Sequence, residues 1–187
     1  YYLSSKYYVS ANPDIRALFE EQLRRLQTDY LDFYLLHGMN ENSFDAFTDE
    51  SRDYIGFLQE QKRLGRIRYL GFSSHAAPET LSRFLDWYDG FDMALLQLNY
   101  IDWKLLNAKR QYEIVTAHNI PIWVMEPMKG GILSSLNPKA AKILKDAAPN
   151  HSLASWGFRF LMGLPNVRTI LSGMSAIAQI KDNLTIF

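Results

Sequence analysis

The strongest constraint on the fold is a repeated alternation of short apolar runs with longer amphipathic segments. Six of the short runs are strand-like, and several are nearly continuously apolar, as strands buried on both faces tend to be. They span residues 2–5, 31–37, 67–73, 93–100, 120–125 and 168–172. Because strands that alternate with helices form parallel sheets covered by those helices, the sequence predicts an α/β fold.

Helices are predicted between these runs from the spacing of their apolar residues. Asn12-Pro13 is expected to start the first helix, since it joins a capping residue to a proline, and Gly65 is expected to end a later one. Five segments show helical spacing. Their sets are Ile15, Leu18, Phe19, Leu23 and Leu26; Tyr54, Leu58, Gln61 and Leu64; Leu81, Phe84, Leu85 and Tyr88; Leu153, Trp156, Phe160 and Leu161; and Ile177, Ile180, Leu184 and Phe187.

Two architectures accommodate six strand–helix units. A doubly wound open sheet holds six, whereas a closed barrel holds eight in about 250 residues, so two further units would complete a barrel. The chain has 187 residues and contains no G-x-G-x-x-G, which argues against the usual dinucleotide-binding form of the open sheet. Periodicity and composition by themselves leave barrel and open sheet undecided.

Charge and cysteine content narrow the classes of function. Twenty Lys and Arg balance twenty Asp and Glu, which favours neither nucleic acid nor an anionic membrane as a partner. No apolar run reaches the roughly 20 residues of a membrane span. The chain has no cysteine and its four histidines are scattered, so we expect no disulfide, no metal site and a cytoplasmic location.

Polar residues follow every predicted strand. In barrel enzymes the active site lies at the C-terminal ends of the strands, so these residues are the candidates for chemistry. They are Lys6, His37, Ser73, Ser74, His75, Gln97, Asn99, Glu126, Lys129 and Ser172. Taken singly, each has a structural alternative: His37 as a half-buried core histidine, Lys6 as a surface lysine, and the serines as partners of backbone groups.

Three strand segments resemble those of one enzyme family. Residues 30–37 read YLDFYLLH and resemble the DxYLLH strand of the aldo-keto reductases. Residues 65–73 read GRIRYLGFS and are similar to that family's GKIRxIGxS segment. Residues 96–100 read LQLNY and resemble its xQxxY strand.

The second half of the chain continues the resemblance. Residues 125–131 read MEPMKGG, similar to the MEPLxGG turn of a bacterial and archaeal branch, some of whose members carry a C-terminal ferredoxin-like segment. Residues 171–175, with Gln179, Asp182 and Asn183, resemble that branch's cofactor-clamping end. The resemblance implies a single (β/α)8 TIM-barrel domain over residues 1–187, with about six units present. We expect the first two strands to lie upstream of this chain, and leave open a further segment at the C-terminus.

The resemblance also implies a catalytic set of aspartate, tyrosine, lysine and histidine. Lys6 aligns with the lysine and His37 with the histidine. In the family, the tyrosine gives a proton to the carbonyl oxygen as hydride reaches the carbon, and the lysine lowers the pKa of that tyrosine. The tyrosine and aspartate are expected upstream. Four tyrosines of this chain lie at the wrong place in the motif order: Tyr1, Tyr2, Tyr7 and Tyr8.

NADPH is the cofactor that the resemblance implies, with NADH left open. Ser74 stands where many relatives have asparagine, Glu126 where many have an aromatic residue, and Gln179 where many NADPH-specific members have arginine. The cofactor-binding positions implied are Ser73, Ser74, Gln97, Glu126, Pro127, Met128, Lys129, Gly130, Ser172, Gly173, Met174, Gln179 and Asn183. His75 and Trp103 are candidates for the substrate pocket.

The predicted function is therefore NAD(P)H-dependent reduction of an aldehyde or ketone by a monomer or homodimer. One alternative is a non-catalytic relative or fragment that lacks the catalytic aspartate and tyrosine and binds only a cofactor or a protein. A third is a barrel of another chemistry, such as a sugar-phosphate isomerase. Cofactor binding and turnover would separate the three.

Overall fold

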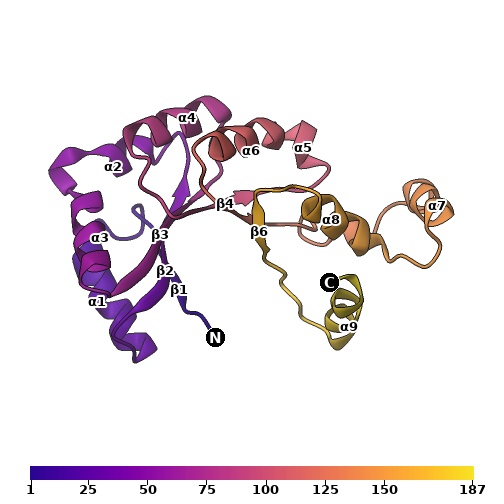
Figure 1. Ribbon diagram of the computed structural model, residues 1–187, viewed down its shortest axis with the longest axis horizontal. Helices are drawn as coiled ribbons and strands as arrows, with labels where there is room; N and C mark the ends of the chain where they lie inside the picture. Colours follow the sequence, from indigo (N-terminus) through magenta and orange to yellow (C-terminus); the bar gives the residue numbers. More distant parts are fainter. The chain divides into compact units, whose positions relative to one another are not determined.

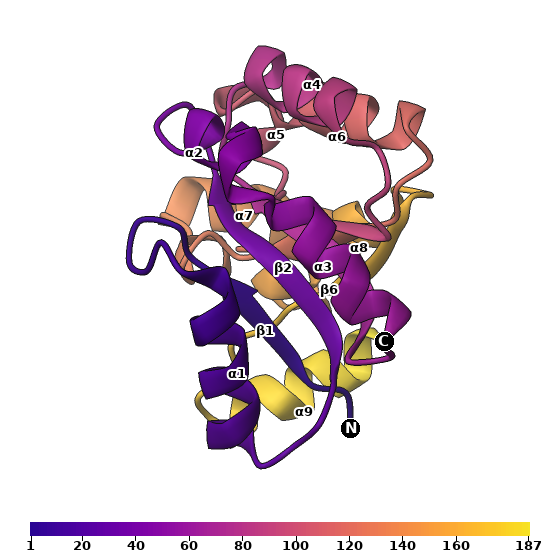
Figure 2. The same cartoon turned by 90° about the vertical axis from the view of Figure 1, so that its left-hand side faces the viewer.

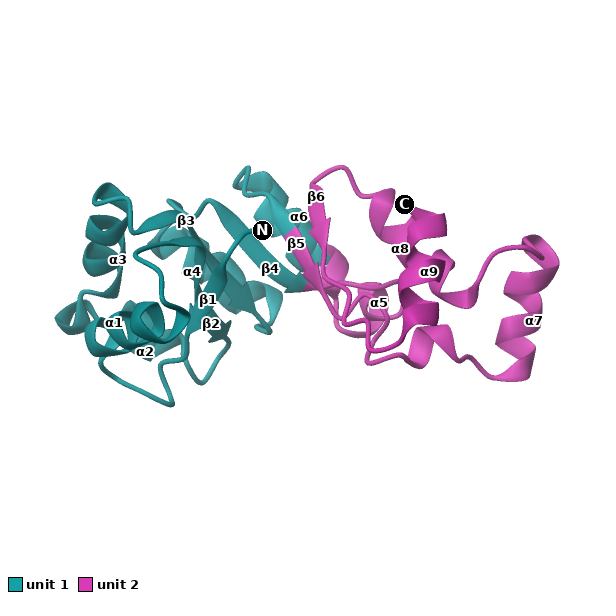
Figure 3. Cartoon of the chain, turned by 90° about the horizontal axis from the view of Figure 1, so that it is seen from below, with its two compact units in different colours: residues 1–96, 110–122 teal, residues 97–109, 123–187 magenta.

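The computed structural model describes residues 1–187, which form six strands, nine α-helices and two short 3-10 helices (Figure 1). The chain divides into two compact units (Figure 3). Unit 1 comprises residues 1–96 and 110–122, and unit 2 comprises residues 97–109 and 123–187. The assignment of residues 1–187 to one barrel domain stays a prediction.

The first part of the chain alternates strands and helices as expected. Its elements are β1 (Ser4–Tyr7), α1 (Ile15–Leu26), β2 (Leu31–Met39), α2 (Phe44–Thr48), η1 (Glu50–Arg52), α3 (Tyr54–Arg63), β3 (Ile67–Ser74), α4 (Pro78–Trp87) and β4 (Met93–Gln97). The rest are α5 (Asp102–Leu105), α6 (Ala108–Ala117), β5 (Ile122–Met125), η2 (Ile132–Ser134), α7 (Pro138–Ala147), α8 (Leu153–Met162), β6 (Val167–Ile170) and α9 (Ile177–Ile186). Helices α2, α5, α6 and α7 had not been predicted from the spacing of apolar residues.

The six strands are hydrogen-bonded in the order in which they occur along the chain, β1-β2-β3-β4-β5-β6. Within unit 1, β1 to β4 are parallel, with Lys6 opposite Leu35 and Leu35 opposite Gly71. Figure 2 shows β1 and β2 side by side with α1 next to β1. A doubly wound sheet reverses its strand order at a switch point, and this sheet does not. The architecture is therefore that of a partial (β/α)8 barrel, and the predicted fold class is confirmed.

Helices cover one face of the unit 1 sheet. Tyr34 of β2 packs against Phe19 of α1 with ring centroids 5.1 Å apart, and Phe72 of β3 packs against Phe84 of α4 at 5.3 Å. Tyr34, Phe19, Phe72 and Phe84 are all fully buried. Because side chains alternate between the two faces of a strand, Lys6, His37 and Ser73 belong to the opposite face, which these helices do not cover.

Several predicted boundaries are wrong by two or three residues: β4 ends at Gln97 and not at Tyr100, β5 begins at Ile122 and not at Ile120, and β6 ends at Ile170 and not at Ser172. The starts of β1 and α1 also differ from the prediction. β1 begins at Ser4, so Lys6 lies within the strand and not after it. α1 begins at Ile15, because Asp14 and not Asn12 caps it: the Asp14 carboxylate accepts hydrogen bonds from the backbone N–H groups of Arg16 and Ala17, both at 3.0 Å. Asn12 instead accepts from the N–H of Asp14. Gly65 follows α3 with a φ of +75°, as a helix-ending glycine does.

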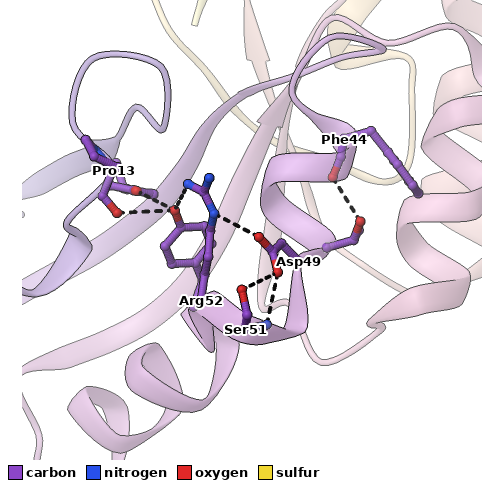
Figure 4. A network of polar contacts seen from close by, with 8 residues as sticks. Pro13, Phe44, Asp49, Ser51 and Arg52 are labelled. Atoms are coloured by element: carbon purple, nitrogen blue, oxygen red, sulfur yellow. Dashed lines mark hydrogen bonds and ion pairs between the residues drawn. The ribbon is translucent and has the colours of Figure 1, made fainter.

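A polar network fixes the segment that leads into α3 (Figure 4). The Tyr54 hydroxyl accepts hydrogen bonds from the Tyr7 hydroxyl and from Arg52 Nη1, and donates to the carbonyl of Pro13. Arg52 Nε donates to Asp49 at 3.1 Å. The network therefore ties β1, the start of α1 and η1 together inside unit 1, away from the polar strand ends.

The last helix buries a different face from the one predicted. Ile177, Leu184 and Phe187 are 67%, 77% and 67% exposed, whereas Ile186 is 8% exposed. Asp182 and Asn183, which lie three to four residues before Ile186, are half-buried. The inward face of α9 thus carries polar residues as well as an isoleucine, because that face contributes to a pocket.

Candidate functional site

Unit 1 brings three of the predicted polar residues together. Lys6 of β1 and His37 of β2 are half-buried, and His75, directly after β3, is exposed. Burial lowers the pKa of Lys6 from its ordinary value of 10.5. Burial, reinforced by the charge of Lys6 and by His75, lowers the pKa of His37 below 6.5. His37 is therefore predominantly neutral at pH 7 and can both donate and accept a hydrogen bond.

An exposed tyrosine that the motif order had set aside lies in the same cluster. The ring of Tyr8 is 5.4 Å from the ring of His37, centroid to centroid, at an angle of 56°. Tyr8 is 46% exposed, whereas Tyr7 is fully buried on the opposite face of β1. The spatial neighbour of His37 is thus decided by the chain's path after β1, which spacing in the sequence does not show.

The two serines at the end of β3 support the backbone around His37. Ser73 is 1% exposed and its Oγ accepts a hydrogen bond of 2.9 Å from the N–H of Gly38. Gly38 directly follows His37 and has a φ of +71°, a conformation that favours glycine. Ser74, fully buried, accepts from the N–H of Ala76. Both hydroxyls serve the strand ends, and their predicted contact with a cofactor stays a prediction.

Unit 2 contains a buried carboxylate that the sequence analysis did not single out. Asp102 is fully buried and accepts hydrogen bonds from Lys129 Nζ at 2.6 Å, Gln97 Nε2 at 2.8 Å and Asn99 Nδ2 at 2.7 Å. Burial by itself raises the pKa of the Asp102 carboxyl, but these three hydrogen bonds outweigh it and hold the pKa below its ordinary value. An acidic residue so soon after a strand end was the signal that could have identified it.

Gln97 and Lys129 both have hydrogen-bond partners within the protein, and their predicted contact with a cofactor stays a prediction. Both were assigned to a cofactor by resemblance, and both donate to Asp102. Asn99 completes the arrangement, since its side-chain oxygen Oδ1 accepts hydrogen bonds from the backbone N–H groups of Ile101 and Asp102. The result is a hydrogen-bonded network that connects the end of β4 to the turn after β5.

The turn formed by residues 126–131 is held from two sides. Lys129 ties it to Asp102, and Met128 packs on Gly157 of α8 so closely that a Cβ at Gly157 would collide with the Met128 side chain. Four residues of the turn have positive φ angles: Glu126 at 53°, Lys129 at 48°, Gly130 at 64° and Gly131 at 94°. The turn is thus a tightly specified piece of backbone and not a loose connection.

This turn forms one wall of a pocket of about 690 Å³ within unit 2. The opposite wall comes from the segment between β6 and α9 and from the first turns of α9. The lining residues are Met125, Glu126, Pro127, Met128, Gly130, Gly131, Ser134, Ala154, Phe158, Leu171, Ser172, Gly173, Met174, Ser175, Ala178, Gln179, Asp182 and Asn183. Nine predicted cofactor positions are among them: Glu126, Pro127, Met128, Gly130, Ser172, Gly173, Met174, Gln179 and Asn183.

Hydrogen bonds order the second wall of the pocket. The side-chain oxygen of Gln179 accepts from the N–H groups of Ser175 and Ala176 and so caps α9. Asn183 Nδ2 donates to Ser172 Oγ at 3.1 Å. Trp103 does not line this pocket but packs edge-to-face on Phe160, with ring centroids 5.3 Å apart. Its predicted role in substrate binding stays a prediction, as does that of His75.

Two further properties concern the whole described chain. It contains no group of three or more histidine and acidic residues placed to hold a metal ion. None of its helices combines the length and the apolar character needed to cross a membrane.

Comparison with known sequences gives a family and relatives. The model of the aldo/keto reductase family matches residues 4–187. The uncharacterized oxidoreductase YqkF of Bacillus subtilis is 26% identical over 188 residues, and an aldo-keto reductase of Mycolicibacterium vanbaalenii is 30% identical over 171 residues. These alignments cover 91% and 88% of this chain but 59% and 54% of the relatives. The chain thus spans a little over half the length of these relatives.

Solved structures share the fold. The aldo-keto reductase AKR11C1 from Bacillus halodurans, in its holo form, has a TM-score of 0.73 at 26% identity, over 92% of this chain and 58% of that one. An aldo/keto reductase from Klebsiella pneumoniae in complex with NADP and acetate has a TM-score of 0.67 at 21% identity, over 98% and 63%. At 21% identity, the likeness to the Klebsiella pneumoniae protein concerns the fold alone.

Proposed function

The chain belongs to the aldo/keto reductase family, since that family's model matches nearly all of it, and from this premise we propose that the protein is an NAD(P)-dependent oxidoreductase that reduces an aldehyde or ketone. The observation that carries the proposal is the pocket of unit 2, where nine residues aligned with cofactor-binding positions meet. The neutral net charge and absence of cysteine support a cytoplasmic protein that acts on a small molecule. A monomer or homodimer belongs to the same proposal.

The pocket fits a nicotinamide cofactor by size and lining. Its volume of about 690 Å³ lies within the range of about 300–1,000 Å³ typical of cofactor sites. Pro127, Met128 and Phe158 supply apolar surface, and Ser172 and Asn183 supply polar groups. A Cβ at Gly130 or Gly173 would meet no atom within 4 Å, so a ligand can approach their backbone closely. A nicotinamide cofactor held by these residues would supply the hydride for carbonyl reduction.

Lys6 and His37 are proposed to act on the carbonyl group. Because His37 is predominantly neutral at pH 7, it can donate a hydrogen bond to a carbonyl oxygen without bringing a charge. Half-buried Lys6 supplies a cation that stabilises negative charge developing on that oxygen or on a nearby proton donor. Because the pKa of Lys6 is lowered, its ammonium gives up a proton more readily than that of an ordinary exposed lysine.

The test combines binding and turnover of the purified protein. NADH and NADPH are titrated by fluorescence, and oxidation of the bound nucleotide is then followed after addition of small aldehydes and ketones. We expect saturable binding and carbonyl-dependent oxidation. His37→Ala should lower kcat by about 10²-fold or more, the usual contribution of a positioned proton donor. The half-buried His118 provides a matched control, His118→Ala, which should leave kcat unchanged.

The outcomes separate the proposed enzyme from the other candidates. Binding without turnover of any carbonyl would favour a cofactor-binding relative that does not catalyse. Failure to bind either nucleotide would refute the proposal and favour another barrel chemistry. An equal kcat for His37→Ala and the unchanged protein would remove His37 from the mechanism while leaving the cofactor site in place.

A further inference from the structure

The unit 2 pocket has no positive charge to match a phosphate monoester. Its two charged lining residues are carboxylates, Glu126 at the start of the turn and Asp182 on the inward face of α9. No lysine, arginine or histidine lines it. A terminal phosphate monoester carries a charge of about −1.5 to −2 at pH 7 and is usually matched by arginine or lysine. This pocket offers such a group no cation.

The one cation within the turn is directed elsewhere. Lys129 stands between the lining residues Met128 and Gly130, but its ammonium lies 2.6 Å from the buried carboxylate of Asp102. Asp102 is fully buried and receives two further hydrogen bonds, and neither it nor Lys129 is among the residues that line the pocket. If Lys129 moved away, the buried Asp102 carboxylate would lose its counter-ion, which is energetically costly. Lys129 is therefore not free to turn toward a phosphate.

The neutral donors near α9 are also partly used. A helix N-terminus attracts anions through its free N–H groups. Here the side-chain oxygen of Gln179 accepts from the N–H groups of Ser175 and Ala176, at 2.8 and 3.1 Å. Asn183 donates to Ser172. These donors are therefore already engaged within the protein, and no side-chain cation lines the pocket to supplement them.

We infer that this pocket discriminates against the extra phosphate of NADPH and prefers NADH, with Asp102 acting as a specificity-determining residue because it withdraws Lys129. The inference rests on the proposed function, since it concerns which nicotinamide cofactor the same pocket takes. It requires the adenosine end of the dinucleotide, which carries the additional phosphate, to lie within this pocket. Wherever the additional phosphate falls within the lining, it meets carboxylates and neutral groups only.

The experiment is a binding titration of the purified protein with NADH and with NADPH, read by nucleotide fluorescence and repeated with the oxidised forms by calorimetry. We expect a Kd for NADH lower by about tenfold or more, since a factor of ten corresponds to a modest Coulomb interaction between charges several ångströms apart. Raising the salt concentration should bring the two dissociation constants closer together, because mobile ions screen the repulsion between the carboxylates and the additional phosphate.

A pair of matched variants isolates the charge. Ala178 lines the pocket from an exposed helical position, so Ala178→Lys adds a cation at little cost to the helix. It should tighten NADPH binding by about tenfold relative to NADH binding, whereas the neutral Ala178→Gln should leave the ratio of the two dissociation constants unchanged. Asp182→Asn should bring the dissociation constants for NADH and NADPH closer together, because it removes one of the two carboxylates that line the pocket.

The results separate this inference from the proposed function. If the unchanged protein binds NADH more tightly than NADPH, and Ala178→Lys reduces that difference, both the inference and the proposed function are supported. NADPH binding as tight as that of NADH, or a ratio unchanged by Ala178→Lys, overturns the inference and leaves the oxidoreductase proposal intact. Binding of neither nucleotide overturns the proposed function, and the inference with it.

Discussion

Replacing Asp102 with asparagine tests the network that joins the end of β4 to the turn of residues 126–131. The substitution keeps size and shape but removes the charge that pairs with Lys129 at 2.6 Å. Removing one partner of a buried ion pair costs about 3–5 kcal/mol. The Lys129 side chain is 25% exposed, so its ammonium can partly recover hydration and reduce that cost. We therefore expect Asp102→Asn to lower the free energy of unfolding by about 2–3 kcal/mol.

Urea unfolding followed by tryptophan fluorescence measures this loss. Trp103, Trp123 and Trp156 all belong to unit 2, so the signal reports mainly on the unit that contains Asp102. In thermal unfolding, about 2–3 kcal/mol corresponds to a decrease in Tm of about 4–12 °C for a chain of this size. An unchanged urea slope would show that the loss arises in the folded state.

A double-mutant cycle with Lys129→Met separates the ion pair from the rest of the network. If the pair is coupled as its geometry implies, the double variant should lose less stability than the sum of the single losses, by at least about 1 kcal/mol. The pKa of Asp102 is depressed from 3.8, so its contribution is present above that pH and is lost as the pH falls through the folded-state pKa. Additive losses, or an Asp102→Asn cost below about 0.5 kcal/mol, would refute the reasoning.

Two further predictions concern the packing of the turn and the titration of the unit 1 cluster. Gly157→Ala should weaken NADH binding, because its Cβ displaces the end of the Met128 side chain, which lines the pocket. Because that side chain is flexible, the free energy of unfolding should change by less than about 1 kcal/mol. Gly163→Ala, whose nearest neighbour is Phe160 O at 3.4 Å, should leave NADH binding unchanged, and equal effects of the two variants in the NADH titration would contradict this. Because the pKa of His37 is lowered from 6.5, the unfolded chain binds more protons there, so stability should fall as the pH falls through about 6.5. His37→Gln should flatten that dependence in urea midpoints measured between about pH 7.5 and 5.5, and identical slopes would show that another group is responsible.

The identity of the family and the order of its elements could be predicted from the sequence. Strands and helices follow from local hydrophobic spacing, which each segment carries by itself. The motifs at residues 30–37 and 125–131 then selected the barrel over the open sheet, and the match of the family model to residues 4–187 confirms that choice. Boundaries were less certain, because the capping of α1 depends on whether Asn12 or Asp14 reaches the free N–H groups.

The partners of the site residues were decided only by tertiary structure. Gln97 and Lys129 have residue types suited to a cofactor, yet both donate to Asp102, which lies 27 positions from Lys129 in the sequence. Tyr8 meets His37 for the same kind of reason, through the course of the chain after β1. The sequence by itself determined which chemical groups stand at the strand ends. The folded chain decided which of them pair with one another, because pairing depends on register and packing between segments that are far apart in sequence.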